Sequence, residues 1–293
     1  MQKGRIIKSL SGFYSVSNEN GTYECKGRGV FRKRKITPLV GDIVSFELDE
    51  NEEGYIKEIE PRMNELVRPP IANVNQAIIV SSAKKPDFSS KLLDRFLVLI
   101  ESAGIQPIIL ITKMDLVSEG ERHKLEKYKE DYKNIGYDIH LVSTKNKLDA
   151  NLILDFFSNQ ITVIAGQSGV GKSSLLNTLL PSLNLKTADI SSSLGRGKHT
   201  TRHVELLSIN NGLVADTPGF SSLDFEKIEQ EDLTDCFPEM KERKTQCKFR
   251  GCMHDKEPKC AIKSAVDQEK ITTYRYEHYL EFLTEIQSRK PRY

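Results

Sequence analysis

Near its middle the chain reads Gly166-Gln167-Ser168-Gly169-Val170-Gly171-Lys172-Ser173, which has the spacing of a phosphate-binding loop. A β-rich run over residues 161–165 precedes it, and a helix is expected over residues 172–180. Backbone N–H groups at such a helix N-terminus can surround phosphate oxygens, so a plain glycine-rich turn is the weaker reading. We expect Lys172 to contact the β- and γ-phosphates and Ser173 to bind Mg²⁺. The predicted nucleotide contacts in this segment are Ala165, Gly166, Gln167, Ser168, Gly169, Val170, Gly171, Lys172, Ser173 and Ser174.

A second phosphate-side motif, Asp216-Thr217-Pro218-Gly219, follows the strand-like run at residues 213–215. A bare Asp-x-x-Gly pattern is expected about once by chance in a chain of this length, so the preceding strand and the Thr-Pro pair carry the prediction. We expect the Asp216 carboxylate and the Gly219 backbone N–H to lie near the γ-phosphate.

A further motif predicts that the bound base is guanine. It reads Thr112-Lys113-Met114-Asp115, lies at the end of another strand-like run and resembles the guanine-recognition element of GTPases. Asp115 can accept from guanine N1–H and from the exocyclic amine, a pair of donors that adenine does not present, while the Lys113 stem can lie over the base. Ser143 and Thr144 follow the next predicted strand, where a backbone N–H can meet guanine O6. The alternative for that second segment is a strand-ending turn.

The order of these motifs indicates a rearranged domain. Base-recognition motifs at residues 112 and 143 precede the phosphate loop at 166 and the Asp216 motif, whereas ordinary GTPases begin with the phosphate loop. The same sheet can form if the usual ends are joined and the chain is opened after Asp216, because the termini of compact domains often lie close together. The sequence therefore predicts a circularly permuted GTPase domain.

The segment between the phosphate loop and Asp216 contains His199, Thr200 and Thr201 and occupies the place of the first switch. One of the two threonines, Thr201 in our assignment, is expected to join Ser173 as a magnesium ligand. Phe220 follows Gly219 where GTPases often carry a water-orienting Gln, so a catalytic polar group must come from elsewhere. His199 is the candidate, and the alternative is an exposed loop residue or one that contacts nucleic acid.

Three thiols and one imidazole lie within a short segment, at Cys247, Cys252, His254 and Cys260. Three of five cysteines crowded together fit reduced thiols and a metal better than a disulfide framework. Four ligands leave no open position, which predicts one structural Zn²⁺ rather than a catalytic one. The two remaining cysteines, Cys25 and Cys236, are expected to be small buried or half-buried residues rather than ligands or nucleophiles.

Three domains are predicted, and the fold class is multidomain α/β. Residues 1–68 show short alternating runs separated by glycines and no helical period, which predicts an OB-type β-barrel. Residues 69–222 begin at a proline pair and alternate apolar runs with amphipathic helices, which predicts a mainly parallel sheet covered by helices. Residues 223–293 lack strand patterns and end in a helical stretch, 272–286, which predicts a small α-rich zinc-binding domain.

Charge and hydropathy restrict the possible partners. No apolar run approaches the roughly 20 residues needed to span a bilayer, and the first residues lack the apolar core of a signal peptide, so we expect a cytoplasmic protein without membrane contact. Residues 26–35 contain six basic residues and no acid, and residues 241–293 carry 13 Lys/Arg against 8 Asp/Glu. Both segments suit a polyanionic partner, and the alternative is a solvated face.

A permuted GTPase domain after an OB-like barrel and before a Cys₃His domain resembles the RsgA (YjeQ) family, the small-ribosomal-subunit-dependent GTPases of bacteria. The motifs that carry the resemblance span essentially the whole chain: Thr112–Asp115, Gly166–Ser173, His199–Thr201, Asp216–Gly219 and Cys247–Cys260. One departure is Thr112, where GTPases commonly have Asn; Thr keeps a hydroxyl that can bond within the loop.

The resemblance implies GTP hydrolysis to GDP and phosphate, stimulated by the small ribosomal subunit, a role in late maturation of that subunit, and binding to its rRNA. We expect a monomer. Two alternatives stay open: an RNA-binding assembly scaffold with a low-turnover GTP site, and a permuted GTPase that acts on the large subunit. The chain leaving Gly219 enters the zinc segment within about thirty residues, so the second switch is expected to act as a tether between them.

Overall fold

The computed structural model describes residues 1–27, 31, 36–51, 53–67, 69–143, 145–180, 204–216 and 223–289. They form two compact units, the first from residues 1–78 and 144–221 and the second from residues 79–143 and 222–293. Strand β8 (Gln76–Ser82) begins in the first unit and ends in the second. Within the described ranges no helix is long and apolar enough to cross a membrane.

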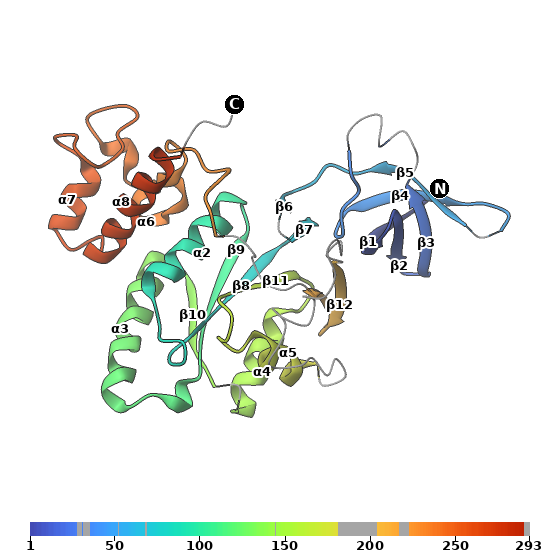
Figure 1. The fold of residues 1–293 in the computed structure, drawn as a ribbon, viewed down its shortest axis with the longest axis horizontal. Coiled ribbons are helices and arrows are strands. Elements are labelled where there is room, and N and C mark those ends of the chain that lie inside the picture. The colour runs from blue at the N-terminus through green and yellow to red at the C-terminus, as the bar shows by residue number, and fades with distance from the viewer. Residues whose placement is uncertain are drawn as a thin grey trace. The chain divides into compact units, whose positions relative to one another are not determined.

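A closed five-strand barrel opens the chain, as the alternating runs predict (Figure 1). Its strands are β1 (Gln2–Leu10), β2 (Phe13–Asn18), β3 (Gly21–Gly27), β4 (Ile43–Leu48) and β5 (Gly54–Ile59). The order β1-β2-β3-β5-β4 is closed by an antiparallel β1–β4 pairing. Every second side chain points inward, so Ile6, Val16 and Phe46 are fully buried. Gly4 is required at a crowded crossing, because a Cβ there would lie 2.6 Å from Val16 Cγ1.

A short hairpin follows the barrel. Strands β6 (Glu65–Val67) and β7 (Pro70–Ala72) pair antiparallel, with Glu65 opposite Ala72. The proline pair predicts an extended chain and a domain boundary here. The prolines alone do not predict the hairpin. Arg62 fixes the same region by donating from Nε and Nη2 to the buried Asp42 carboxylate at 2.7 and 2.8 Å.

The α/β part of the first unit surrounds the phosphate loop. Strand β11 (Ile161–Ala165) runs parallel to β13 (Gly212–Asp216), and β12 (Glu205–Ile209) is antiparallel to β13. Helices α4 (Lys147–Phe156) and α5 (Lys172–Leu179) lie on either side of β11 in the sequence. Strand β12 also pairs with β1, with Lys8 opposite Glu205, so the barrel and this sheet are joined by backbone hydrogen bonds and by the Lys8–Glu205 ion pair.

The second unit combines the remaining α/β elements with the C-terminal helices. Strands β9 (Gln106–Thr112) and β10 (Asp138–Leu141) are parallel neighbours, and α2 (Ser90–Ser102) and α3 (Glu119–Ile135) accompany them. Helix α3 begins at a capping box, because the Ser118 and Glu121 side chains each bond the other's backbone N–H. This matches the predicted alternation of strands and helices.

Residues 223–289 contain no strand, as predicted. They form the 3₁₀ turns η3 (Leu233–Cys236) and η4 (Lys244–Gln246) and the helices α6 (Pro238–Lys241), α7 (Ala261–Asp267) and α8 (Thr273–Gln287). A buried cluster that includes Phe237, Tyr279 and Phe282 packs together with Val98 of α2. The C-terminal helices therefore share a core with α2.

Candidate functional site

The phosphate loop connects β11 to α5, between a buried strand and the first turn of a helix. Gly166, Gly169 and Gly171 have φ values of 142°, 81° and 103°, a region that L side chains rarely adopt. Lys172 Nζ donates to the carbonyls of Gly166 and Gln167, each at 2.7 Å. The predicted strand-loop-helix context is present, and the lysine ammonium lies inside the loop's own curve.

Burial in this loop lowers the pKa of Lys172 to about 8. The cause is the loss of water around the ammonium, which disfavours the charged form. A nearby anion has the opposite effect, because it stabilises the ammonium. The lysine environment is thus suited to a negatively charged ligand.

The base-recognition segment begins where β9 ends. Thr112 is fully buried and its Oγ1 donates to the Ser81 carbonyl at 3.1 Å. Lys113 adopts a left-handed conformation with φ of 60°, and its Nζ donates to the Lys85 carbonyl. The Met114 backbone N–H then donates to the Val142 carbonyl at 3.2 Å. These bonds connect the end of β9 to the end of β8, to the chain just after β8 and to the chain after β10, so the segment has a fixed backbone.

Asp115 and Ser143, which the sequence assigns to one base site, are joined in the structure. Ser143 Oγ donates to Asp115 Oδ1 at 2.8 Å, and the Asp115 side chain is exposed. The hydroxyl therefore orients a carboxylate that is open to a ligand. Thr144, the other predicted residue of this segment, lies outside the described residues.

The phosphate loop belongs to the first unit and the base-recognition segment to the second. Asp216 ends β13, with its backbone opposite Glu205 of β12, and its side chain is outside the description. The predicted switch residues His199, Thr200, Thr201 and Gly219 also lie outside the described residues. Of the basic segment 26–35, the structure describes Lys26, Gly27 and Phe31.

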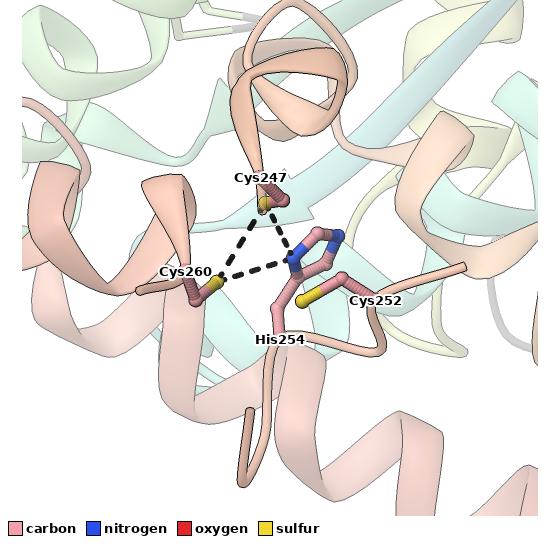
Figure 2. Close-up of side chains that lie close together, drawn as sticks. All are labelled: Cys247, Cys252, His254 and Cys260. Carbon is pink, nitrogen blue, oxygen red and sulfur yellow. Dashed lines mark hydrogen bonds between the residues drawn. The ribbon is translucent and has the colours of Figure 1, made fainter. Parts of the chain in front are cut away.

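The four predicted metal ligands converge (Figure 2). Cys247 Sγ, Cys252 Sγ, a ring nitrogen of His254 and Cys260 Sγ all lie within 4.8 Å of one another. His254 Nδ1 is 3.5 Å from Cys247 Sγ and 3.3 Å from Cys260 Sγ, and these two sulfurs are 3.9 Å apart. Metal–sulfur bonds of ~2.3 Å and metal–nitrogen bonds of ~2.0 Å give tetrahedral edges of about 3.5 to 3.8 Å. A Cys₃His metal-binding group is therefore present, with the spacing of a tetrahedral site.

The surroundings of this metal-binding group hold the ligands in place. The Tyr276 hydroxyl donates to the His254 carbonyl at 2.6 Å, and the Tyr279 hydroxyl donates to the Met253 carbonyl at 3.0 Å. The Glu257 carboxylate accepts from the backbone N–H of Met253 at 2.7 Å. Burial raises the pKa of the Cys252 thiol to about 12, so a bound cation is needed to favour its thiolate.

Cys25 and Cys236 are buried and do not belong to this group, as expected. Burial raises the pKa of Cys25 to about 11 and that of Cys236 to about 12, which keeps both as unreactive thiols.

A buried charge network links the C-terminal helices to α2, and sequence reasoning missed it. Arg275 of α8 is fully buried and donates to Asp94 at 2.5 Å and to both oxygens of Glu239, at 2.8 and 3.0 Å. His278 Nδ1 lies 2.6 Å from the second Asp94 oxygen, and the Tyr132 hydroxyl donates to the first at 2.6 Å. The one signal in the sequence is Asp94 itself, a charged residue between Leu93 and Phe96 on the apolar face of α2.

The fold and the phosphate loop define a class of protein: an α/β GTPase with an added five-strand barrel and a Cys₃His metal-binding segment. The family model for the RsgA GTPase matches residues 59–226, and that for the RsgA N-terminal domain matches residues 3–56. The chain belongs to the RsgA GTPase family.

Relatives and solved structures agree with this assignment. The chain is 64% identical to the small ribosomal subunit biogenesis GTPase RsgA 2 of Oceanobacillus iheyensis and 57% identical to the corresponding RsgA of Bacillus subtilis, in both cases over 100% of each chain. The crystal structure of YloQ, described as a circularly permuted GTPase, is 53% identical, with a TM-score of 0.87 over 100% of this chain and 97% of that one. YjeQ from Thermotoga maritima is 36% identical, with a TM-score of 0.88 over 99% of each chain.

Proposed function

We propose that this chain hydrolyses GTP to GDP and phosphate on the small ribosomal subunit, during late maturation of that subunit. The observation that carries the proposal is Lys172, a partly desolvated ammonium held by two carbonyls inside a loop at a helix N-terminus. Relatives with 57% and 64% identity are named small ribosomal subunit biogenesis GTPases. The names of these relatives support the small ribosomal subunit as the partner, and Lys172 supports binding of the nucleotide phosphates.

Each site residue has a proposed role. Asp115 reads the guanine edge while Ser143 orients its carboxylate, and Thr112, Lys113, Met114 and Thr144 complete the base site. Residues 165–174 hold the phosphates. Asp216 and Gly219 face the γ-phosphate, and Ser173 and Thr201 hold Mg²⁺, which neutralises phosphate charge when it is bound. His199 orients the attacking water.

The flanking parts have structural and binding roles in this proposal. The Cys₃His group holds one Zn²⁺ in a closed four-ligand site, which stabilises residues 247–260, a stretch with few apolar residues of its own. The barrel at residues 1–68 and the segment at 223–293 flank a GTPase domain at 69–222 and contact rRNA through their basic clusters. We propose that the protein works as a cytoplasmic monomer, without membrane contact.

Turnover measured alone, with purified small subunits and with purified large subunits tests the proposal. Intrinsic hydrolysis should be slow, within about a decade or two of ~10⁻⁴ s⁻¹, because Phe220 replaces a water-orienting Gln. Small subunits should raise this rate strongly and large subunits should not. Stimulation by large subunits alone would assign the chain to that particle, and no stimulation by either would favour an RNA-binding scaffold.

The role of His199 has a separate test on the same assay. His199→Ala should lower the stimulated rate by at least tenfold and leave GTP affinity nearly unchanged, because the proposed contact is to water rather than to nucleotide. His199→Ala protein with an unchanged stimulated rate would remove this residue from the mechanism.

A further inference from the structure

The loop between the first two metal ligands presents an aromatic ring to solvent. Residues 248–251 separate Cys247 from Cys252, and all four are exposed. Phe249 is 43% exposed, although large apolar side chains are ordinarily buried. Lys248 Nζ lies over its ring at 5.4 Å from the centroid. We call residues 248–251 the knuckle loop.

The charged residues next to Phe249 in the sequence are positive. From Arg243 to His254 the sequence has four Lys or Arg residues and no Asp or Glu. Lys244 is already paired with Asp235, whereas Lys248 and Arg250 have no carboxylate partner among the described residues. Two unpaired cations therefore flank Phe249 directly in the sequence and lie exposed with it.

The knuckle loop is held at both ends. Cys247 and Cys252 belong to the metal-binding group, and the chain just beyond Cys252 is fixed by the bonds of Tyr279 and Glu257 to the Met253 backbone. Gly251 takes a φ of 74°, which lets the chain turn back toward the second ligand. A ring presented on such a support loses little conformational entropy when it binds a partner.

We propose that the knuckle loop is a stacking site for an unpaired nucleotide of small-subunit rRNA, with the base on the Phe249 ring and the neighbouring phosphates on Lys248 and Arg250. This rests on the proposed function. Proteins bind single-stranded nucleic acid by combining aromatic rings, which stack on bases, with cations along the backbone. An apolar protein surface or a membrane fits less well, because the ring is a single apolar side chain among cations rather than part of an apolar patch.

Substitutions at Phe249 separate stacking from bulk. In the full-length, metal-loaded protein, Phe249→Ala should weaken small-subunit affinity roughly five- to a hundredfold, the range measured for loss of one base–aromatic stack. Phe249→Tyr should restore most of the loss and Phe249→Leu little of it, because leucine has no aromatic face. Leu148→Ala, which changes a 77% exposed residue of α4, is the matched control and should bind normally. Bound zinc and basal GTP hydrolysis should be unchanged in every variant.

The absence of tryptophan in the sequence makes the contact directly observable. In Phe249→Trp the new indole is the sole tryptophan, and stacking on a base should quench its fluorescence when protein-free small-subunit rRNA or a single-stranded oligonucleotide is added. Duplex RNA should quench it much less, and Leu148→Trp should not respond.

Failures of the two proposals can be distinguished. If wild-type protein is stimulated by small subunits but Phe249→Ala binds them normally and the indole of Phe249→Trp is not quenched, the stacking site is overturned and the proposed function stands. If Phe249→Ala binds small subunits weakly but protein-free rRNA does not quench the Phe249→Trp variant, the ring contacts a ribosomal protein and the RNA assignment is overturned. A wild-type protein that neither binds nor responds to small subunits overturns the proposed function itself.

Discussion

Lys172 shows how a single residue can tie nucleotide binding to pH. Its pKa is lowered to about 8 by burial, and bound phosphates raise it by stabilising the ammonium. Below pH 8 the lysine is charged before and after binding, so affinity is fully present. As the pH rises through 8, Lys172 loses its proton in the free protein and must regain it when GTP binds, so the affinity falls. The fall ends once the pH exceeds the pKa of Lys172 in the bound state.

We therefore expect GTP affinity to be nearly constant from pH 7 to about 8 and to fall by up to tenfold per pH unit above it. Calorimetric titrations in buffers of different ionisation enthalpy should register proton uptake above pH 8. Lys172→Arg keeps its charge throughout this range and should bind without the inflection, whatever its absolute affinity. An identical pH profile for both proteins would place the titration elsewhere.

Asp115 determines the second prediction at this scale. Asp115→Asn should lower GTP affinity by roughly ten- to a hundredfold, because two hydrogen bonds to a charged acceptor are weakened, and should narrow the preference for GTP over ATP. Ser143→Ala removes the 2.8 Å bond that orients the carboxylate, so a several-fold loss that is equal for GTP and GDP is expected. Competition binding of the three nucleotides measures both effects. A GTP-to-ATP ratio that Asp115→Asn leaves unaltered would contradict the guanine assignment.

Helix α2 is the element on which the second unit depends. Asp94 on one turn reaches the buried Arg275, and the next residue, Arg95, bonds Glu285. Lys91 on the same helix pairs with Glu281 in a bridge whose partners are each 51% exposed. One helix thus holds α8 by a buried pair and by an exposed pair, which permits an internal comparison.

Arg275→Met should destabilise the protein by about 3–5 kcal/mol, because it leaves the Asp94 and Glu239 carboxylates buried without their cation. Lys91→Met should cost about 0–1 kcal/mol, because an exposed pair gains little over hydration. Urea unfolding followed by circular dichroism would measure both. Equal losses in the two variants would mean that burial does not decide the value of these charges.

At the scale of the whole molecule, the chain that follows the second switch is bonded to other parts of the protein from residue 223 onward, which the sequence does not indicate. Arg95 Nε donates to the Leu223 carbonyl at 2.5 Å, and Arg289 donates from Nη1 to the Phe225 carbonyl at 2.6 Å and also to the Ile228 carbonyl. Residues 223–228 are therefore fixed to α2 and to the chain just after α8. A displacement of the second switch that moves residues 223–228 would therefore act on α2 and on the C-terminal helices together.

We expect small-subunit affinity to differ between GDP and a non-hydrolysable GTP analogue, and by linkage the subunit must favour one nucleotide by the same factor. Replacing Arg95 and Arg289 together by Ala should shrink this difference, because residues 223–228 lose their anchors. Lys91→Ala, which removes an α2–α8 contact without touching that segment, should preserve it. Sedimentation with subunits in each nucleotide state gives the comparison; a difference of the same size in all three proteins would show that the anchored segment does not transmit the nucleotide state.

The sequence by itself determined the features whose chemistry is local. The phosphate loop and the Cys₃His group are short motifs, and residue types at fixed spacing suffice to predict them; the barrel follows from alternation along single strands. Only the tertiary structure decided which distant side chains meet. Asp94 and Arg275 are 181 residues apart, and nothing in either neighbourhood specifies the other. The anchoring of residues 223–228 likewise depends on Arg95 of α2 and on Arg289, which follows α8 and lies near the other end of the second unit's sequence. A buried charge is stable only beside its partner, and folding rather than sequence proximity supplies that partner.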